Sequence, residues 1–201
     1  MKKLAILVSG RGSNMTAIID ACEQGKLQAS VELVISNNAN SKALILAQEK
    51  NISTAHLSSQ VYPESDVLDQ AMKALLDSYK VDYVLLAGFM KKIGAETLAA
   101  YKNRIINIHP SLLPKFGGQG MFGLNVHKAV IDAGEKETGV TIHLVDEEYD
   151  KGAILAQRTV SVTAEDTPET LSEKVLRVEH ILFSETIEKI IDGSIILPLD
   201  K

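Results

Sequence analysis

The sequence predicts an α/β protein with a Rossmann-like, mostly parallel central sheet of about seven strands and helices on both faces. Two observations predict this class. Short, almost continuous apolar runs, such as residues 4–8 and 83–87, are typical of parallel strands that are buried on both faces. Segments with apolar residues at helical spacing alternate with these runs. Because hydrophobic residues make up 45% of the chain and no Pro/Gly/Ser-rich linker divides it, we expect one domain with a sizeable core.

The first four strands and the helices between them follow from apolar spacing and from turn residues. A glycine-rich turn ends the first apolar run and opens a helix in which Met15, Ile18 and Cys22 share one face. Gly25 is a natural end for this helix, and Gly88 closes the fourth strand. In order, we expect strand 4–8, helix 14–24, strand 31–35, helix 41–50, strand 54–57, helix 63–79 and strand 83–87.

The second part of the chain contains a short helix, a strand with a polar end, and a long loop before its remaining elements. Arg104-Ile105-Ile106 leads into the strand with the polar end, and Pro110 stops that strand from continuing. Thr167 is a suitable N-cap for a long final helix. In order, we expect helix 95–101, strand 105–109, helix 126–133, strands 141–145 and 154–160, and helix 168–192.

Charge and cysteine content exclude several classes of function. The formal net charge is −5, so the chain lacks the basic footprint of a general nucleic-acid binder. Its one cysteine, Cys22, provides neither an internal disulfide nor a zinc site of several cysteines, and the histidines are scattered, so we expect no metal. After Lys3, only five apolar residues precede Ser9, which is too few for a signal peptide or a membrane span. We therefore expect a cytoplasmic protein with no membrane and no nucleic-acid partner.

The turn Gly10-Arg11-Gly12-Ser13-Asn14 lies between the first strand and the first helix. Its glycines allow close approach to a ligand, and free amides at the start of a helix favour a phosphate group. The dinucleotide fingerprint requires a third glycine where Met15 stands, and the Gly-Lys-Ser/Thr of a P-loop is absent. The turn therefore favours a phosphate monoester. The alternative is a tight turn that serves packing only, with Ser13 or Asn14 capping the helix.

The run Asn107-Ile108-His109-Pro110-Ser111-Leu112-Leu113-Pro114 joins two polar side chains to the end of a buried strand. Asn107 and His109 are two positions apart, so on an extended chain they point to the same face. An amide can donate to a developing negative charge, and imidazole is the side chain whose ordinary pKa lies near neutrality. Open α/β sheets bind ligands at the carboxyl ends of their strands, so we expect a catalytic site here. The alternative is a hydrogen-bonded strand end without a catalytic role.

With these motifs in view, the chain resembles the phosphoribosylglycinamide formyltransferase family over nearly its whole length. The motifs occur in the family's order, which is the 9–14 turn, Leu86-Ala87-Gly88-Phe89-Met90, the run 107–114, and then residues 146–152. The run 107–114 alone is similar to a wider formyltransferase superfamily. The combination and order of the four motifs make the resemblance specific.

The resemblance implies an activity and an organisation. The activity is transfer of a formyl group from 10-formyltetrahydrofolate, a co-substrate, to the amino group of 5-phosphoribosylglycinamide in de novo purine biosynthesis. The organisation is a single formyltransferase domain, 1–201, with a phosphosugar-binding half (1–103) and a catalytic and folate-binding half (104–201). Partners are expected to be small-molecule substrates, and the protein is expected to be a monomer or a weak homodimer.

The resemblance also implies residue roles, with Asn107, His109 and Asp150 matching the catalytic trio. Asn107 and a protonated His109 would stabilise the oxyanion of a tetrahedral intermediate. Asp150 would relay a proton and raise the pKa of His109, although it is alternatively a plain turn residue. The other implied contacts are Gly12, Ser13 and Asn14 for the substrate phosphate, Glu179 for the substrate, and Phe89, Met90, Lys91, Lys92, Ile93, Val145, Asp146 and Glu147 for the folate.

Two departures from the family pattern affect these expectations. After Lys115, residues 116–123 read Phe-Gly-Gly-Gln-Gly-Met-Phe-Gly, where the family commonly has an aromatic residue, Pro and Gly. This loop is longer by about five residues, so a lid here would differ in shape. Residues 64–66 stand where the family often has an arginine for the folate tail, and Lys91 and Lys92 are the alternatives for that role.

The remaining histidines and acidic residues receive no catalytic role. His127 opens a helix and is expected at the surface, whereas His143 either faces the site or sits in the core. Residues 146–148 are expected to form a solvated loop. Three rival functions stay open. They are a methionyl-tRNA formyltransferase, which has an additional tRNA-binding domain, a formyltetrahydrofolate hydrolase, which usually has a regulatory domain, and a non-catalytic phosphosugar sensor that uses only the 10–14 turn.

Overall fold

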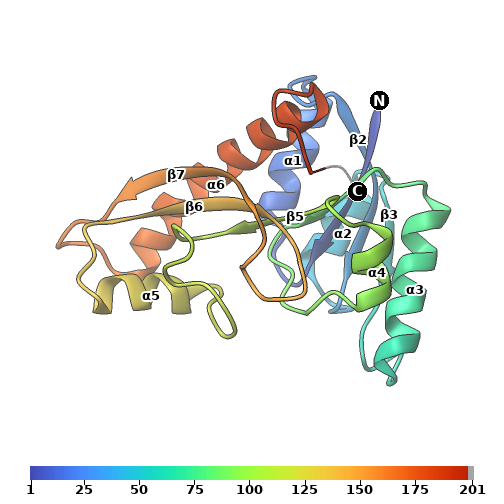
Figure 1. The fold of residues 1–201 in the computed structure, drawn as a ribbon, viewed down its shortest axis with the longest axis horizontal. Helices are drawn as coiled ribbons and strands as arrows, with labels where there is room; N and C mark the ends of the chain where they lie inside the picture. The colour runs from blue at the N-terminus through green and yellow to red at the C-terminus, as the bar shows by residue number, and fades with distance from the viewer. Residues whose placement is uncertain (199–201) are drawn as a thin grey trace.

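In the computed structural model, which describes residues 1–198, seven strands form one sheet (Figure 1). The strands are β1 (Lys2–Val8), β2 (Ala29–Ser36), β3 (Ser53–His56), β4 (Tyr83–Leu86), β5 (Ile105–His109), β6 (Glu137–Leu144) and β7 (Ile154–Ser161). They lie in the order β3-β2-β1-β4-β5-β6-β7. Strands β1 to β5 are parallel, whereas β6 pairs antiparallel with both β5 and β7. The predicted mostly parallel sheet of about seven strands is therefore confirmed.

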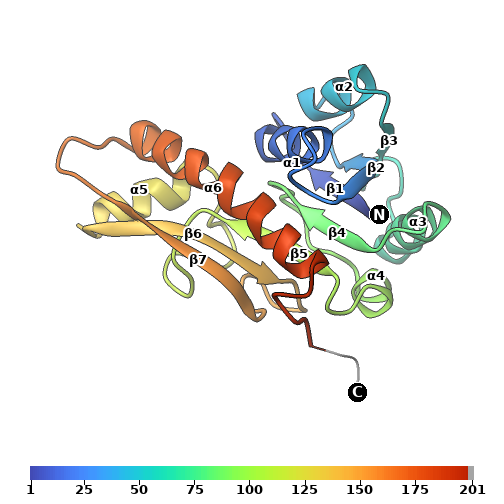
Figure 2. The same cartoon turned by 90° about the horizontal axis from the view of Figure 1, so that it is seen from above.

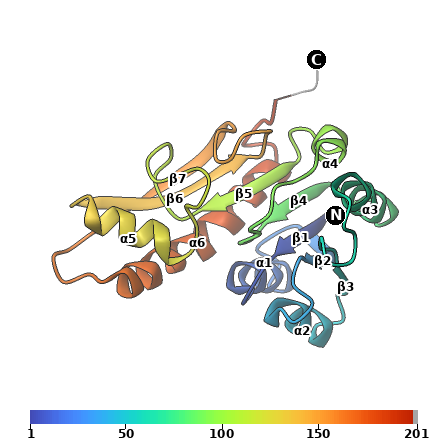
Figure 3. The ribbon, with the colours of Figure 1, turned by 90° about the horizontal axis from the view of Figure 1, so that it is seen from below.

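Helices cover both faces of this sheet, as predicted. They are α1 (Ser13–Glu23), α2 (Lys42–Glu49), α3 (Ser65–Ser78), α4 (Ala95–Ala100), α5 (Leu124–Asp132) and α6 (Pro168–Ile191). One core contains residues of α1, α2, α5 and α6, and α6 lies beside α1 (Figure 2). The other core contains residues of α3 and α4, which lie side by side away from β6 and β7 (Figure 3).

The central strand β1 shows why the sequence pattern predicts this architecture. Leu4 and Ile6 enter the core on one side of the sheet, and Ala5 and Leu7 enter the core on the other side. All four side chains are fully buried. Because neighbouring residues of a strand point to opposite faces, a strand covered on both faces must be apolar at every position.

The predicted boundaries agree with the structure within a few residues, with two informative exceptions. Strand β6 begins at Glu137, earlier than expected, because its pairing with β7 extends to Glu137 and Ser161. Helix α1 has Gly12 at its N-cap and no side-chain cap, so a capping role for Ser13 or Asn14 is wrong. The predicted cap of α6 is confirmed, because the Thr167 hydroxyl accepts a hydrogen bond from the amide three residues later.

Within residues 1–198, no helix combines the length and apolar character that a membrane crossing requires.

A buried carboxylate joins α3 to α4. Oxygens of Asp69 accept hydrogen bonds from the Glu96 amide at 2.7 Å and from the Thr97 amide at 3.1 Å. These amides lie in the first turn of α4, where a helix offers no internal acceptor. Gly94 permits the contact because a Cβ at that position would overlap the Asp69 carboxylate. The anchored helix start also holds residues 88–94, which connect β4 to α4.

Replacement of Asp69 by alanine is expected to lower the free energy of unfolding by about 2–4 kcal/mol, because buried amides of α4 lose a charged acceptor. Equilibrium urea unfolding measures the change. Asp132→Ala, at the exposed end of α5, is the matched control and is expected to shift the unfolding free energy by less than about 0.5 kcal/mol. Equal stability of Asp69→Ala and the wild type would contradict the anchoring role.

The expectation that His127 lies at the surface is wrong. Helix α5 turns Val126, His127 and Val130 toward the core, and His127 is only 3% exposed. Within residues 1–198, its Nδ1 has no hydrogen-bond partner. Burial, with a smaller contribution from His109, lowers the pKa of His127 from 6.5 to about 4. The folded protein therefore keeps this ring neutral into the mildly acidic range.

This buried histidine makes stability depend on pH. The unfolded chain protonates His127 near pH 6.5, whereas the folded chain does so only near pH 4. Stability that is present above pH 6.5 is therefore lost as the pH falls toward 4, by an amount on the order of 3 kcal/mol. The unfolding free energy, measured in urea at about pH 7 and about pH 4.5, is expected to differ less in His127→Gln than in the wild type. His56→Gln controls for the loss of a histidine, and an unchanged pH dependence in His127→Gln would contradict the linkage.

Candidate active site

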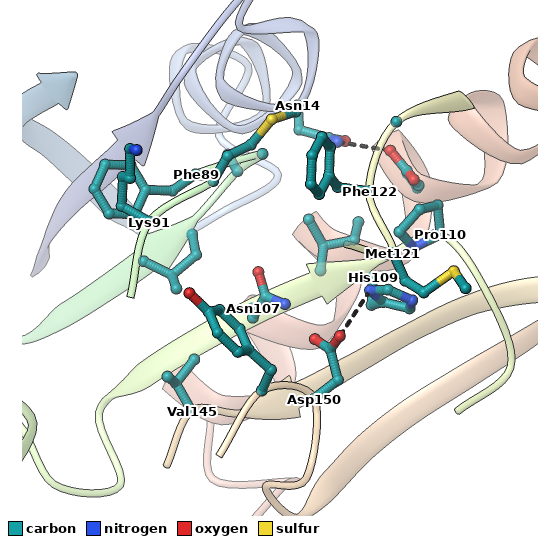
Figure 4. Close-up of a pocket in the computed structure, with 18 of the residues that line it drawn as sticks. Asn14, Phe89, Lys91, Asn107, His109, Pro110, Met121, Phe122, Val145 and Asp150 are labelled. Carbon is teal, nitrogen blue, oxygen red and sulfur yellow. Dashed lines mark hydrogen bonds and ion pairs between the residues drawn. The ribbon is translucent and has the colours of Figure 1, made fainter. Parts of the chain in front are cut away.

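A cavity of about 560 Å³ opens beyond the carboxyl ends of β1, β4 and β5. Strand β1 lies between β2 and β4, so the connections that follow β1 and β4 leave in opposite directions along the sheet. Such a switch point is where open α/β sheets bind ligands, and the volume suits a small molecule. Figure 4 shows side chains from the start of α1, from β5 and from three loops that surround one space.

The structure brings His109 and Asp150 together. His109 ends β5, Asp150 belongs to the β6–β7 loop, and Nδ1 of His109 lies 3.6 Å from Oδ2 of Asp150 (Figure 4). Nε2 of His109 lies 2.8 Å from the carbonyl oxygen of Phe116. Because a carbonyl can only accept, Nε2 holds a proton and donates it to this bond. Asp150 has a φ of 58°, as a turn residue does, but its carboxylate also faces the cavity and accepts a hydrogen bond from the Gly118 amide at 2.8 Å.

His143 faces the site rather than sitting apart in the core, and it orients the Asn107 amide. The two residues are paired across the antiparallel β5–β6 ladder. Nδ1 of His143 is 2.7 Å from the Leu144 carbonyl, so in the neutral ring this nitrogen holds the proton. Nε2 of His143 then accepts a hydrogen bond from Nδ2 of Asn107 at 3.0 Å. Nδ2 has a second hydrogen that this bond does not use. The Asn107 amide is therefore fixed as a donor beside the His109–Asp150 pair.

Burial dominates the electrostatics of His109. Burial lowers the pKa of His109 below 6.5. Asp150 and the Phe116 carbonyl raise this pKa, but they do not reverse the shift. His143 makes a further, smaller contribution that lowers it. Asp150 thus raises the pKa of His109 as expected, but burial outweighs this effect and the net shift is downward. Burial raises the pKa of Asp150, but the two histidines and the Gly118 amide lower it to a net value below 3.8. At neutral pH, the pair holds a carboxylate and a mostly neutral ring, and negative charge that forms nearby favours protonation of the ring.

The glycine-rich turn presents backbone amides to the same cavity. Gly12 adopts a φ of 79°, and a Cβ there would lie 2.7 Å from Cβ of Ala43 on α2. Glycine is therefore required both by the backbone conformation and by packing. Residues 10–14 all line the cavity, and amides in the first turn of α1 have no acceptor within the helix. This geometry can bind an anion.

The Asn14 side chain contacts α6. Its Nδ2 donates to Oε2 of Glu179 at 2.7 Å, and its Oδ1 has no hydrogen-bond partner among the described residues. Glu179 is 7% exposed, and burial raises its pKa against the opposing effect of the Asn14 hydrogen bond. Ser172 and Leu176 line the cavity with Glu179. Their helical spacing is a signal that was available in the sequence, although only Glu179 was predicted.

The segments after β4 and β6 form the apolar side of the cavity. Every residue that was implied for the folate lines the cavity except Glu147, which is exposed and lies outside the lining. The Glu148 amide donates to Oδ1 of Asp146 at 2.9 Å, a tight turn that places Glu147 at its outer corner. Residues 146–148 are exposed, as expected for a solvated loop. The residues that line the cavity are Phe89, Met90, Lys91, Lys92, Ile93, Val145 and Asp146.

Ser9 connects the apolar side of the cavity to the glycine-rich turn. Its hydroxyl accepts a hydrogen bond from the Met90 amide at 2.8 Å and donates to Oδ1 of Asn37 at 2.5 Å. Its own amide donates to the Gly88 carbonyl at 3.1 Å. The segment after β4 is therefore held in place by the residue that precedes the 10–14 turn.

The 116–123 loop also lines the cavity, which motif spacing did not predict. Residues 118–123 all contribute, and the Phe122 ring, 48% exposed, projects toward Asn14 (Figure 4). The departure from the family pattern therefore lies within the site. His127 completes the lining from α5. Within residues 1–198, no group of three or more His, Cys, Asp or Glu side chains is arranged to hold a metal ion.

Comparison with known proteins extends these observations. The model of the formyl transferase family matches residues 2–187. The phosphoribosylglycinamide formyltransferase of Haemophilus influenzae is 37% identical over 193 residues, which cover 96% of this chain and 89% of that protein. The chloroplastic enzyme of the same name from Arabidopsis thaliana is 43% identical, over 96% of this chain and 67% of that protein. The chain spans 62% of the corresponding Vigna unguiculata protein, so it matches about two thirds of the plant relatives' length.

Solved structures share the fold. Glycinamide ribonucleotide transformylase 1 from Symbiobacterium toebii aligns with a TM-score of 0.92 at 35% identity, over 98% of this chain and 91% of that chain. Phosphoribosylglycinamide formyltransferase from Bacillus halodurans aligns with a TM-score of 0.89 at 39% identity, over 96% and 97% of the two chains. Sequence identity over most of both chains, together with the matched fold, shows that the chain belongs to the formyl transferase family and, within it, to the phosphoribosylglycinamide formyltransferases.

Proposed function

We propose that the protein transfers a formyl group from 10-formyltetrahydrofolate to the amino group of 5-phosphoribosylglycinamide, a step of de novo purine biosynthesis. One observation carries the proposal. Asn107, His109 and Asp150 line the same cavity as the amides of the 10–14 turn, so an acyl-transfer site and an anion site share one space. The names of relatives that match nearly the whole chain support the same activity.

The phosphosugar is proposed to bind at the start of α1. Amides of Gly12, Ser13 and Asn14 receive the phosphate, favoured by the positive end of the helix dipole. Glu179, held by Asn14 at 2.7 Å, is buried beside this turn and suits hydrogen bonding to the sugar or the glycinamide. In this arrangement the Asn14 side chain orients Glu179, and the backbone amide of Asn14 donates a hydrogen bond to the phosphate.

The formyl donor is proposed to bind against Phe89, Met90, Ile93 and Val145, an apolar surface that suits a flat heterocycle. Met90 is 48% exposed, so it has apolar surface to bury against a ligand. Lys91 and Lys92 are exposed on the same segment and suit a carboxylate tail. Asp146 lies at the same side, and Glu147 is not proposed for this role.

The trio is proposed to act on the migrating one-carbon unit. The amine attacks the formyl carbon, a C–N bond forms, and the carbonyl oxygen gains negative charge in a tetrahedral intermediate. Asn107 donates an N–H to that oxygen, and the developing charge draws onto Nδ1 of His109 the proton that the attacking nitrogen has passed to Asp150. Asp150 accepts the proton that the attacking nitrogen loses and delivers it, directly or through water, to the departing folate nitrogen. Collapse of the intermediate breaks the second C–N bond, so protons and electrons balance without a covalent enzyme intermediate.

The expected halves of the domain share these roles unevenly. The phosphate turn belongs to residues 1–103, and the trio belongs to residues 104–201, of which the last three lie outside the described residues. Residues 89–93 of the first half are proposed to contact folate, and Glu179 of the second half to contact the phosphosugar. We also infer that the protein is a cytoplasmic monomer or weak homodimer. Its substrates are proposed to be small molecules only, since the net charge of −5 disfavours a tRNA acceptor.

A steady-state assay with both substrates tests the activity. Asn107→Ala and His109→Ala are each expected to lower kcat by about 10²–10³, because each removes a preorganised stabiliser of the oxyanion. Asn40→Ala, at an exposed position after β2, is the control and is expected to retain wild-type rates. Full activity of the two site variants would overturn the mechanism, and release of formate without an acceptor amine would favour a hydrolase.

Gly12→Ala is expected to raise KM for phosphoribosylglycinamide by about tenfold while changing KM for the formyl donor by less than about twofold. The added carbon meets Ala43, and φ of 79° strains any other residue, so the amides of the turn must shift. Gly25→Ala is the matched control, because its φ is 70° and its added carbon meets no atom within 4 Å at the other end of α1. Equal effects of the two substitutions on KM would contradict the assignment of the phosphate site.

A further inference from the structure

One turn of the chain touches both members of the His109–Asp150 pair through its backbone. The turn is Phe116-Gly117-Gly118, named here the 116–118 turn. The Phe116 carbonyl accepts from Nε2 of His109 at 2.8 Å, and the Gly118 amide donates to Oδ2 of Asp150 at 2.8 Å. These contacts arise two residues apart, at the start of the loop in which this chain departs from its family pattern.

The conformation of the 116–118 turn is costly and tightly packed. Phe116 has a φ of 55°, a left-handed conformation that residues with a side chain rarely adopt. A Cβ on Gly117 would lie 2.5 Å from Cδ2 of Leu113 and 3.2 Å from Cβ of Asp150. Strained backbone of this kind persists where surrounding contacts fix it, and here those contacts include both side chains of the pair.

The two hydrogen bonds decide which atoms can exchange a proton. A carbonyl oxygen carries no proton, so Nε2 of His109 keeps its hydrogen in both charge states of the ring. Only Nδ1 can then gain or lose one, and Nδ1 lies 3.6 Å from Oδ2 of Asp150. The Gly118 amide holds that same oxygen in place. On His109, the mobile proton is therefore confined to Nδ1, which faces Asp150; the other oxygen of Asp150 lies 3.5 Å from Nε2 of His143.

We propose that the 116–118 turn is a positioning element that keeps His109 in its Nε2–H form and aims its Nδ1 at Asp150. The turn itself does not contact the reacting atoms. The catalytic consequence rests on the proposed formyl transfer, because that reaction needs a proton relay at this point. The locked ring form does not depend on the reaction and can be tested without substrates.

The groups that face His109 come from several elements and must all be considered in a test that varies pH. Asp150 approaches from the β6–β7 loop, His143 from β6, and His127 from α5. The 116–118 turn supplies a carbonyl and no charge. A change at the turn leaves these three titratable groups in the chain, so an altered pH profile would report their changed position relative to His109.

Nitrogen-15 NMR of the histidine rings in the intact protein tests the lock directly. In the neutral ring of wild-type His109, assigned by its absence in His109→Gln, Nε2 is expected to be protonated and Nδ1 unprotonated. As the pH falls, only Nδ1 is expected to titrate. A neutral ring that carries its proton on Nδ1 would overturn the proposal, whether or not the protein proves to be a formyltransferase.

Gly117→Ala tests the catalytic consequence, because the added carbon displaces the turn from Asp150. We expect kcat to fall on the order of 10- to 100-fold with little change in either KM, a shift of the pH profile, and a second ring form of His109 in the NMR spectrum. Gly134→Ala, just after α5 and outside the cavity lining, is the matched control, since it strains the backbone at a φ of 66° but adds its carbon in open space. This control is expected to keep the ring form and the pH profile of the wild type.

Two outcomes would contradict the positioning role. Gly117→Ala could retain the wild-type ring form and pH profile, or Gly134→Ala could reproduce the effects of Gly117→Ala. If Gly117→Ala fails to fold, the ring form of the wild-type protein still decides the question. If the wild-type protein transfers no formyl group, the proposed function fails while the NMR result continues to test the lock.

Discussion

The site depends on the way the β6–β7 loop folds back along β5. Strand β6 pairs antiparallel with β5, so its end lies near the start of β5, where the Val145 amide donates to the Ile105 carbonyl. Asp150 can meet His109, at the other end of β5, only because the loop reverses over the strand. Gly152 makes the return possible, since a Cβ there would overlap the Leu144 carbonyl. The same pairing sets His143 opposite Asn107, so the strand register positions both of these polar side chains.

Burial and charge act against each other within this arrangement. Removal of His109 from water disfavours its cation, and the neighbouring carboxylate recovers only part of that loss. The resting pair therefore keeps a carboxylate beside a largely neutral ring, which negative charge on a ligand can convert to a cation. The site therefore stabilises the negative charge of the tetrahedral transition state more than it stabilises the uncharged formyl group of the bound substrate. This difference is what lowers the barrier of the reaction. The backbone of the 116–118 turn limits this response to one ring nitrogen.

Local pattern was sufficient to predict the elements and part of the site. Apolar runs and helical spacing predicted every strand and helix, because both periodicities are set by the backbone itself. The spacing of Asn107 and His109 predicted their common face. The position of His143 depended on the β5–β6 register, a long-range property that no short motif encodes. The prediction that His127 lies at the surface was wrong, although Val126 and Val130 on the same helix indicate a face that points to the core. The downward shift of the His109 pKa results from burial of the ring, and the extent of burial cannot be read from the sequence. The 116–123 loop departs from the family pattern in sequence, but its contacts with His109 and Asp150 join distant parts of the chain and depend on the fold.

The most direct measurement is a crystal structure of the protein with phosphoribosylglycinamide and an unreactive analogue of 10-formyltetrahydrofolate. The formyl oxygen is predicted to lie about 3 Å from Nδ2 of Asn107 and close to the His109 ring, with the amine facing Asp150. The phosphate is predicted to accept hydrogen bonds from amides of the 10–14 turn. A phosphate bound elsewhere, or a one-carbon group beyond the reach of Asn107 and His109, would contradict the shared site from which the function is inferred.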